Sequence, residues 1–399
     1  MSQTPRINLV LFVSYIVITI VVFVGASVLP SFRSIANAPL REVILPAPAP
    51  IVVPVLYSTE KESWLNEVVA DFESSPRYRV DGRPIRLEMK KMGSREMILD
   101  VLDGVEEPVL LSPASSLQAS ILESQSASKF GKPLANAANC RSVVNTPLVL
   151  VAWRERAQIL WGDNPPDQMW HQVHDVLVDP QGWAAYDHPD WGYIKFGHTD
   201  PLKSNSGFMT VLLMTYDYFG KTSGLTSADL LSDTDYQQWL IELESTVSNF
   251  GDSTGTYMKE IVAYGPSVHD IVTVYEATAI EHAENAVGRY GELRVYYPPA
   301  TVMSDHPFCI LDADWVSPEQ TEAAQMFIDY LQTQPVQELA LLKYGFRPTN
   351  PAVPLEQPGS PFERYVPNGL RVDLPPQVEV PPGDVLDTLL DFWLRNIQR

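Results

Sequence analysis

The sequence of 399 residues predicts an α/β protein whose body opens with a mainly parallel sheet. Short runs of β-branched residues alternate with stretches in which apolar residues recur every three or four positions, so strands should alternate with helices. This order is typical of a parallel sheet with helices on its faces. A third observation, a long charge-free stretch near the N-terminus, predicts a separate membrane segment.

The first part of the body follows a βαβαβ order. Thr59 and Glu62 have the spacing of a capping box, and an apolar helical series follows them. Two later helical patterns begin after Gly93-Ser94 and Ser115-Ser116. The predicted strands of this part are 51–56, 85–89 and 109–111.

The second part begins with a long apolar strand at 143–153 and passes through a Trp-rich stretch to about residue 190. Ser317 and Gln320 have capping spacing, with Pro318 at the first turn of the helix that follows. The other predicted elements are helices at 208–219, 258–263 and 384–395, strands at 293–297 and 308–311, and a strand that becomes a helix within 271–286.

Composition excludes several classes of protein. With 28 basic and 49 acidic residues the formal charge is −21, which argues against a nucleic-acid partner, because such partners require a basic surface. No nucleophile elbow, phosphate loop, zinc-protease helix or dinucleotide glycine motif is present, so we expect no enzyme and no cofactor. Acidic pairs are plentiful, so a hydrolase of the glycosidase type stays a weaker alternative.

The N-terminal stretch at 7–29 carries no charge over 23 residues, enough for a helix to span about 30 Å of hydrocarbon. The alternative is a cleaved signal peptide, but its only small-residue cleavage motif, at 36–38, is followed by Pro39. We therefore expect residues 1–38 to form a retained single-pass anchor in the cell membrane. Because a large acidic body follows a very short N-terminal flank, we expect that body on the extracytoplasmic side.

Proline marks two further segments. Residues 39–50 contain alternating prolines and predict a semi-rigid linker in the polyproline II conformation. Residues 350–399 predict a Pro-rich C-terminal extension that ends in an amphipathic helix.

Six segments, in this order, carry a resemblance to a known family. The chain resembles bacterial extracellular solute-binding proteins of the type 2 periplasmic-binding fold, the group that includes molybdate-like binders, over roughly residues 51–350. The segments are VPVLYSTEKESWLNEVVADFE, PVLLSPASSL, NTPLVLVAW, GHTDPLKSNSGF, VYEATAI and YYPPATVMSDHPFCILDADWVSPEQTEAAQMFIDYL.

The resemblance implies two α/β lobes, each a mainly parallel sheet with flanking helices, joined by two crossover strands. Lobe one would comprise 51–147 and 308–349, and lobe two 148–307. It also implies capture of a small polar ligand between the lobes, with an ABC-type permease as partner. The apparent anchor and the C-terminal extension depart from the simplest family pattern, so a membrane-tethered sensor or scaffold without transport stays an alternative.

Hydroxyl-rich strand-to-helix turns are the candidate ligand site, because helix N-termini present free N–H groups to a ligand. The alternative for each turn is an ordinary N-cap. If Asp200 and Glu276 both line the cleft, the site is not a pure oxyanion site and suits a ligand with an amine, several hydroxyls or a bound cation. The candidate residues are Ser58, Thr59, Ser115, Ser116, Thr199, Asp200, Ser204, Asn205, Ser206 and Glu276.

Two further groups of residues are weighed. His171 and His174 could share a helix face, but no third ligand lies nearby, so no metal site is expected. Cys140 and Cys309 lie close to the two crossover strands that the resemblance implies, so we expect a disulfide near the hinge in an oxidising compartment. The alternative, two buried free thiols, stays open at this stage.

Overall fold

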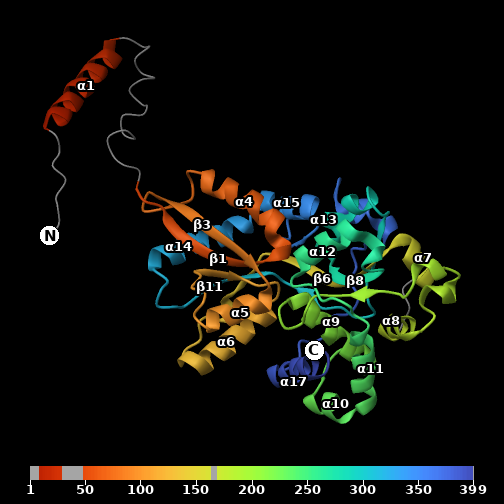
Figure 1. The fold of residues 1–399 in the computed structure, drawn as a ribbon. Coiled ribbons are helices and arrows are strands. Elements are labelled where there is room, and N and C mark those ends of the chain that lie inside the picture. Colours follow the sequence, from red (N-terminus) through yellow and green to blue (C-terminus); the bar gives the residue numbers. More distant parts are fainter. Residues whose placement is uncertain (1–8, 29–47, 163–168, 399) are drawn as a thin grey trace. The chain divides into compact units, whose positions relative to one another are not determined.

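The computed structural model describes residues 9–28, 48–162 and 169–398. Residues Met1–Ala49 and Pro50–Arg399 are two separate compact units, and the first contains helix α1 (Leu9–Val28) (Figure 1). Over the described ranges, no helix combines the length and apolar character that a membrane crossing requires. The predicted linker at 39–50 lies outside the described residues up to position 47.

The larger unit contains two mixed sheets. The first has six strands in the order β2-β3-β1-β4-β11-β5, with β1 parallel to both β3 and β4 and β11 antiparallel to β4. The βαβαβ prediction for this part is therefore confirmed. Its strands are β1 (Ile51–Ser58), β2 (Arg79–Val80), β3 (Arg83–Met92), β4 (Leu110–Ser112), β5 (Arg141–Ser142) and β11 (Pro307–Ile310).

Helices cover both faces of this first sheet, and together they form the first lobe (Figure 1). Val53 and Val55 of β1 face α4 and α14, whereas Leu56 faces α5 and α6. The alternation follows from the two-residue period of a strand. Its helices are η2 (Thr59–Lys61), α4 (Glu62–Ser74), α5 (Ser94–Leu102), α6 (Ser116–Phe130), η3 (Ala137–Asn139), α14 (Pro318–Leu331) and α15 (Gln334–Tyr344).

The second sheet centres on β6 (Val144–Trp153) and belongs to the second lobe. The prediction of a mainly parallel sheet is wrong here, because β6 is antiparallel to its neighbours β8 and β9. β6 enters from the first lobe, so no crossover helix sets its direction, whereas helix α13 joins β8 to β9 and makes those two run the same way. The other strands are β7 (Phe196–Gly197), β8 (Ile271–Tyr275), β9 (Leu293–Tyr296), β10 (Met303–Ser304) and β12 (Arg347–Pro348).

Both faces of β6 are buried. Leu148 and Leu150 pack with α8, α9 and α11, whereas Val149 and Val151 pack with α12 and α13. A continuous apolar run is what a strand buried on both sides requires. The helices of this lobe are α7 (Arg154–Trp161), α8 (Met169–Val178), η4 (Gly182–Tyr186), η5 (Pro189–Trp191), α9 (Asn205–Tyr218), α10 (Ser227–Ser232), α11 (Thr234–Ser245), α12 (Thr254–Tyr264), η6 (Gly265–Ser267) and α13 (Glu276–Val287).

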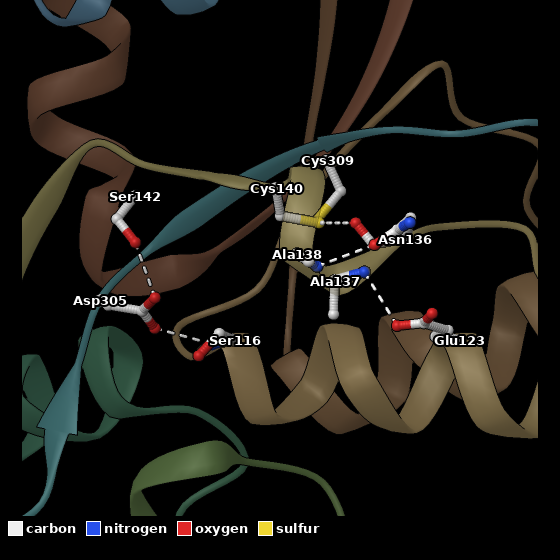
Figure 2. Close-up of a disulfide and its surroundings, with 9 residues drawn as sticks. All are labelled: Ser116, Glu123, Asn136, Ala137, Ala138, Cys140, Ser142, Asp305 and Cys309. Atoms are coloured by element: carbon white, nitrogen blue, oxygen red, sulfur yellow. Dashed lines mark hydrogen bonds between the residues drawn. A yellow bond between two sulfur atoms is a disulfide. The ribbon is translucent and has the colours of Figure 1, made fainter.

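The chain passes between the lobes where β5 leads into β6 and where β10 leads into β11, and β12 makes a further crossing by pairing with β6. Figure 2 shows the first two of these segments side by side, joined by a disulfide between Cys140 and Cys309. Beside it, Asp305 accepts hydrogen bonds from the Ser116 amide at 2.7 Å and the Ser142 hydroxyl at 2.7 Å. These bonds tie the returning segment to the first lobe.

The C-terminal extension packs on the second lobe. Phe362 and Leu370 join the core on the α12 side, whereas Leu389 and Trp393 join the core on the α9 side. The extension therefore covers both faces of the second sheet rather than forming a separate domain. Its helices are α16 (Pro361–Arg364), η7 (Val366–Asn368) and α17 (Gly383–Asn396), the last close to the range predicted from its amphipathic pattern.

Candidate functional site

The predicted ligand residues are buried at strand-to-helix turns of the two lobes. All are buried except Ser116, which is half-buried. Ser58, Thr59, Ser115 and Ser116 come from the first lobe, and Thr199, Asp200, Ser204, Asn205, Ser206 and Glu276 come from the second.

The turn before α9 is the centre of the hydroxyl groups. The Ser206 hydroxyl lies 2.7 Å from that of Thr199 and 2.6 Å from that of Thr254, the first residue of α12. A Cβ atom at Gly207 would lie 1.9 Å from the Thr199 carbonyl oxygen, so only glycine permits this tight packing of helix against turn. Thr254 was absent from the prediction, because a Ser-Thr-Gly start resembles an ordinary N-cap.

The turn at Ser58 and Thr59 in the first lobe contacts the start of α12 in the second lobe. The Gly255 amide donates to the Thr59 hydroxyl at 3.3 Å, although Thr59 was expected to share a capping box with Glu62. That expectation is wrong, because a 3-10 turn precedes α4 and Glu62 instead binds Lys91 and Lys259. A Cβ at Gly255 would lie 2.8 Å from the Thr59 carbonyl oxygen, so glycine allows the lobes to approach closely.

Asn205 connects the second lobe to α6 of the first. Its side-chain carbonyl accepts from the Gln118 amide at 3.1 Å, and its own amide donates to the Tyr275 hydroxyl at 2.9 Å. Burial raises the pKa of the Tyr275 phenol, which stays a neutral hydroxyl. The prediction does not include Gln118, an amide in the first turn of α6, because apart from Asn205 it considers only hydroxyl and acidic residues at the turns.

The turn at Ser115 and Ser116 is engaged in capping its own helix. The Ser115 hydroxyl accepts from the Leu117 amide at 3.2 Å, and the Ser116 amide is held by Asp305. For these two residues the structure matches the N-cap alternative. Asp200 is similarly engaged, since its carboxylate accepts from the Leu202 amide at 2.8 Å and shapes the turn before α9.

Glu276 does not bond to the hydroxyl network. Its carboxylate binds the Arg347 guanidinium twice, at 2.8 Å each, and accepts from the Tyr297 hydroxyl. The same guanidinium donates to the carbonyls of Arg371 and Val372 at 2.7 Å. Glu276 is fully buried, and these bonds anchor the C-terminal extension rather than face a solute.

A buried charge cluster at the end of β1 was not predicted. The Lys61 ammonium donates to the Ser58 hydroxyl at 2.5 Å and to the Ser112 carbonyl at 3.1 Å, and it lies 3.2 Å from His306 Nδ1. The Glu60 carboxylate lies 3.9 Å from the Lys61 ammonium and 3.3 Å from His306 Nδ1. Charged residues in a first helical turn usually face water, so the sequence carries no signal for this burial.

Burial also sets the ionisation of the cluster. It lowers the pKa of Lys61 to about 8, although Glu60 and Asp305 oppose the change. Burial, with the nearby Lys61 charge, lowers the pKa of His306 well below its usual value, so the imidazole is neutral at pH 7. His306 lies between β10 and β11 with a positive φ of 40°, an unusual conformation for a residue with a side chain.

The other histidines have structural partners. His198 contacts the Glu244 carboxylate at 3.0 Å and the Thr199 carbonyl at 2.8 Å. These contacts stabilise the turn before α9. His171 and His174 contact separate carboxylates, and no cluster of metal-ligating side chains occurs among the described residues.

Solved structures with the same fold are binding proteins. The sulfate-binding protein SubI of Mycobacterium tuberculosis is 16% identical, with a TM-score of 0.54 over 82% of this chain and 94% of its own. AfuA of Actinobacillus pleuropneumoniae, with fructose-6-phosphate bound, is 14% identical, with a TM-score of 0.56 over 87% and 99%. Iron-bound HitA of Pseudomonas aeruginosa is 16% identical, with a TM-score of 0.54 over 88% and 100%.

Sequence comparison gives the family. An uncharacterized protein of Mycobacterium tuberculosis strain H37Rv is 24% identical over 269 residues, 65% of this chain but only 36% of that relative's length. A family model described as bacterial extracellular solute-binding protein matches residues 53–347, which include both lobes. This chain therefore belongs to the bacterial extracellular solute-binding protein family.

Proposed function

We propose that the protein is a membrane-anchored solute-binding protein that captures a small polar solute between its lobes and delivers it to an ABC-type permease. In this proposal the anchor is the charge-free stretch at 7–29, and the body acts outside the cytoplasm without catalysing a reaction. The solute contacts are made by Ser58, Thr59, Ser204, Asn205 and Ser206, with Thr254 added.

One observation carries the proposal. Hydroxyl groups that lie far apart in the sequence come together beside the lobe–lobe contact. Ser206 meets Thr254 within the second lobe, and the next residue, Gly255, meets Thr59 of the first lobe. The α9 and α12 helices both start here, and neither has an acidic residue in its first turn. Their free N–H groups and partial positive charge suit the polar groups of a solute.

We expect Ser206→Ala to weaken solute binding about 5- to 150-fold, because one buried hydrogen bond is worth about 1–3 kcal/mol. A panel of small polar solutes screened by thermal shift identifies the ligand, and calorimetry then measures its affinity for the variant. The melting temperature without solute should fall as well, because the buried Ser206 hydroxyl also bonds those of Thr199 and Thr254, so the affinity is the deciding measurement.

Thr215→Ala is the matched control, since Thr215 lies on the same helix α9 but bonds the Val211 carbonyl and the Tyr236 hydroxyl. It should lower the melting temperature and leave affinity intact. A Ser206→Ala variant that keeps its full affinity, as Thr215→Ala should, would remove this turn from the site.

The proposed anchor requires that the mature protein keep its N-terminal stretch. We expect the membrane fraction to contain the protein with its N-terminus at Met1 or Ser2, because Pro39 disfavours cleavage after Ala38. N-terminal sequencing of the mature protein checks this, and a start near Pro39 would contradict it.

A tethered sensor or scaffold is the second candidate function. It is favoured by direct bonds between the lobes, such as those between Gln118 and Asn205 and between Glu62 and Lys259. A sensor predicts a signalling partner bound to the anchored protein, whereas an importer predicts a co-purifying permease.

A further inference from the structure

The charges around the lobe–lobe contact identify a class of solute. Resting on the proposed function, we propose that the solute is a small compound that carries hydroxyl or amine donors and no net negative charge. In this view Glu60 and Asp305 keep multiply charged oxyanions such as sulfate out of the site.

First, carboxylates lie at the starts of three helices of the first lobe. Glu60 lies in the turn that leads into α4, Glu96 accepts from the Gly93 amide at the start of α5 at 3.2 Å, and Asp305 accepts from the Ser116 amide of α6. Each of these carboxylates offsets the positive end of a helix dipole, and Glu96 and Asp305 also occupy N–H groups. An oxyanion held from both lobes would therefore meet carboxylates on one side.

Second, the cations near the contact have acidic neighbours. Lys61 lies 3.9 Å from Glu60, Lys203 lies 2.7 Å from Asp252, and Lys259 lies 2.9 Å from Glu62. Arg95 has Asp387 of α17 as a charged neighbour, while its Nη1 is buried without a hydrogen-bond partner among the described residues. None of the three lysines is an uncompensated cation on which a dianion could rely.

Third, one acceptor at the contact has no partner. The Gln118 side chain donates its amide to Asn205, while its carbonyl oxygen Oε1 is buried and has no hydrogen-bond partner within the described part of the chain. A buried acceptor requires a donor, which a hydroxyl or an ammonium supplies and a sulfate or molybdate ion does not.

Calorimetry on the full chain with sulfate and molybdate as probes tests the inference. The wild-type protein should show no binding to either ion. Glu60→Gln keeps an acceptor for the Ser58 hydroxyl but removes the negative charge beside Lys61, so it should change the result from no detectable binding to measurable binding of these ions. Asp305→Asn, which keeps an acceptor for the Ser116 amide, should gain in the same direction if Glu60→Gln fails to fold.

Glu284→Gln is the matched control, because it removes one negative charge from an exposed pair with Arg364. It should gain no oxyanion binding. Binding of sulfate or molybdate by the wild-type protein overturns the inference, and so does a folded charge variant that gains none.

A parallel screen with neutral sugars, polyols and α-amino acids separates this inference from the proposed function. Binding of one of these compounds by the wild-type protein supports both. A wild-type protein that binds no compound of any class contradicts the proposed function and with it the assigned solute class.

Discussion

Replacing Arg347 by methionine should lower the free energy of unfolding by about 3–5 kcal/mol, because it leaves the Glu276 carboxylate buried without its partner. Glu276 is fully buried and Arg347 is 6% exposed, so water cannot replace the lost guanidinium. Burial alone would lower the pKa of Arg347, yet the bonds to Glu276 raise it, which indicates a firmly charged pair. Urea denaturation of the wild-type and variant proteins measures the loss.

Arg364→Met is the control for this experiment. Arg364 binds Glu284 at 2.7 Å, but the two side chains are 52% and 74% exposed, so the loss should be below about 1 kcal/mol. Changing both buried partners, as Glu276→Leu with Arg347→Met, should recover part of the stability. Equal losses for Arg347→Met and Arg364→Met would show that the buried pair does not hold the extension in place.

Removing the disulfide should have an effect of similar size. Cys140 and Cys309 are 169 residues apart, and closing so long a loop stabilises the fold by about 4–5 kcal/mol in the chain-entropy model. Cys140→Ser with Cys309→Ala is the suitable variant, because Cys309 is buried and a serine there would leave a hydroxyl unpaired. Denaturation with and without a reducing agent measures the difference.

The reducing agent supplies the internal control. It should destabilise the wild-type protein and leave the double variant unchanged, because that variant has no disulfide to lose. Mass spectrometry of the non-reduced protein from cells should show two hydrogens fewer than the dithiol form. A mass that fits two free thiols would contradict the bridge.

The order of strands and helices could be predicted because local residues decide it. The parallel pairing of β1 with β3 and β4 follows from apolar runs separated by helical patterns, and the Ser317 cap with Gln320 lies where its spacing predicts. The direction of β6 could not be predicted in this way. An apolar run reads the same in either direction, and the antiparallel pairing depends on where the chain enters the second lobe.

A local sequence pattern predicts some of the candidate site residues and not others. Hydroxyls near the starts of helices make Thr59, Ser204 and Ser206 candidates, since Ser and Thr at a strand-to-helix turn are a local pattern. Nothing local distinguishes Glu276, which the structure pairs with Arg347, from an acidic residue that meets a solute. For Glu60 and Lys61 the sequence suggests exposure, because charged residues in a first helical turn usually face water. The structure buries both side chains.

Residue patterns predict the α/β class, the candidate turns and the two cysteines available for one bridge. Three features depend on the folded chain instead: which turns face one another, which residue pairs with Glu276 and which charges surround the contact between the lobes. The two groups differ in the sequence separation over which the interactions act. Hydrophobic period and capping act within a few residues, whereas burial and ion pairing depend on groups brought together from 71 residues away for Glu276 and Arg347 and 196 for Thr59 and Gly255.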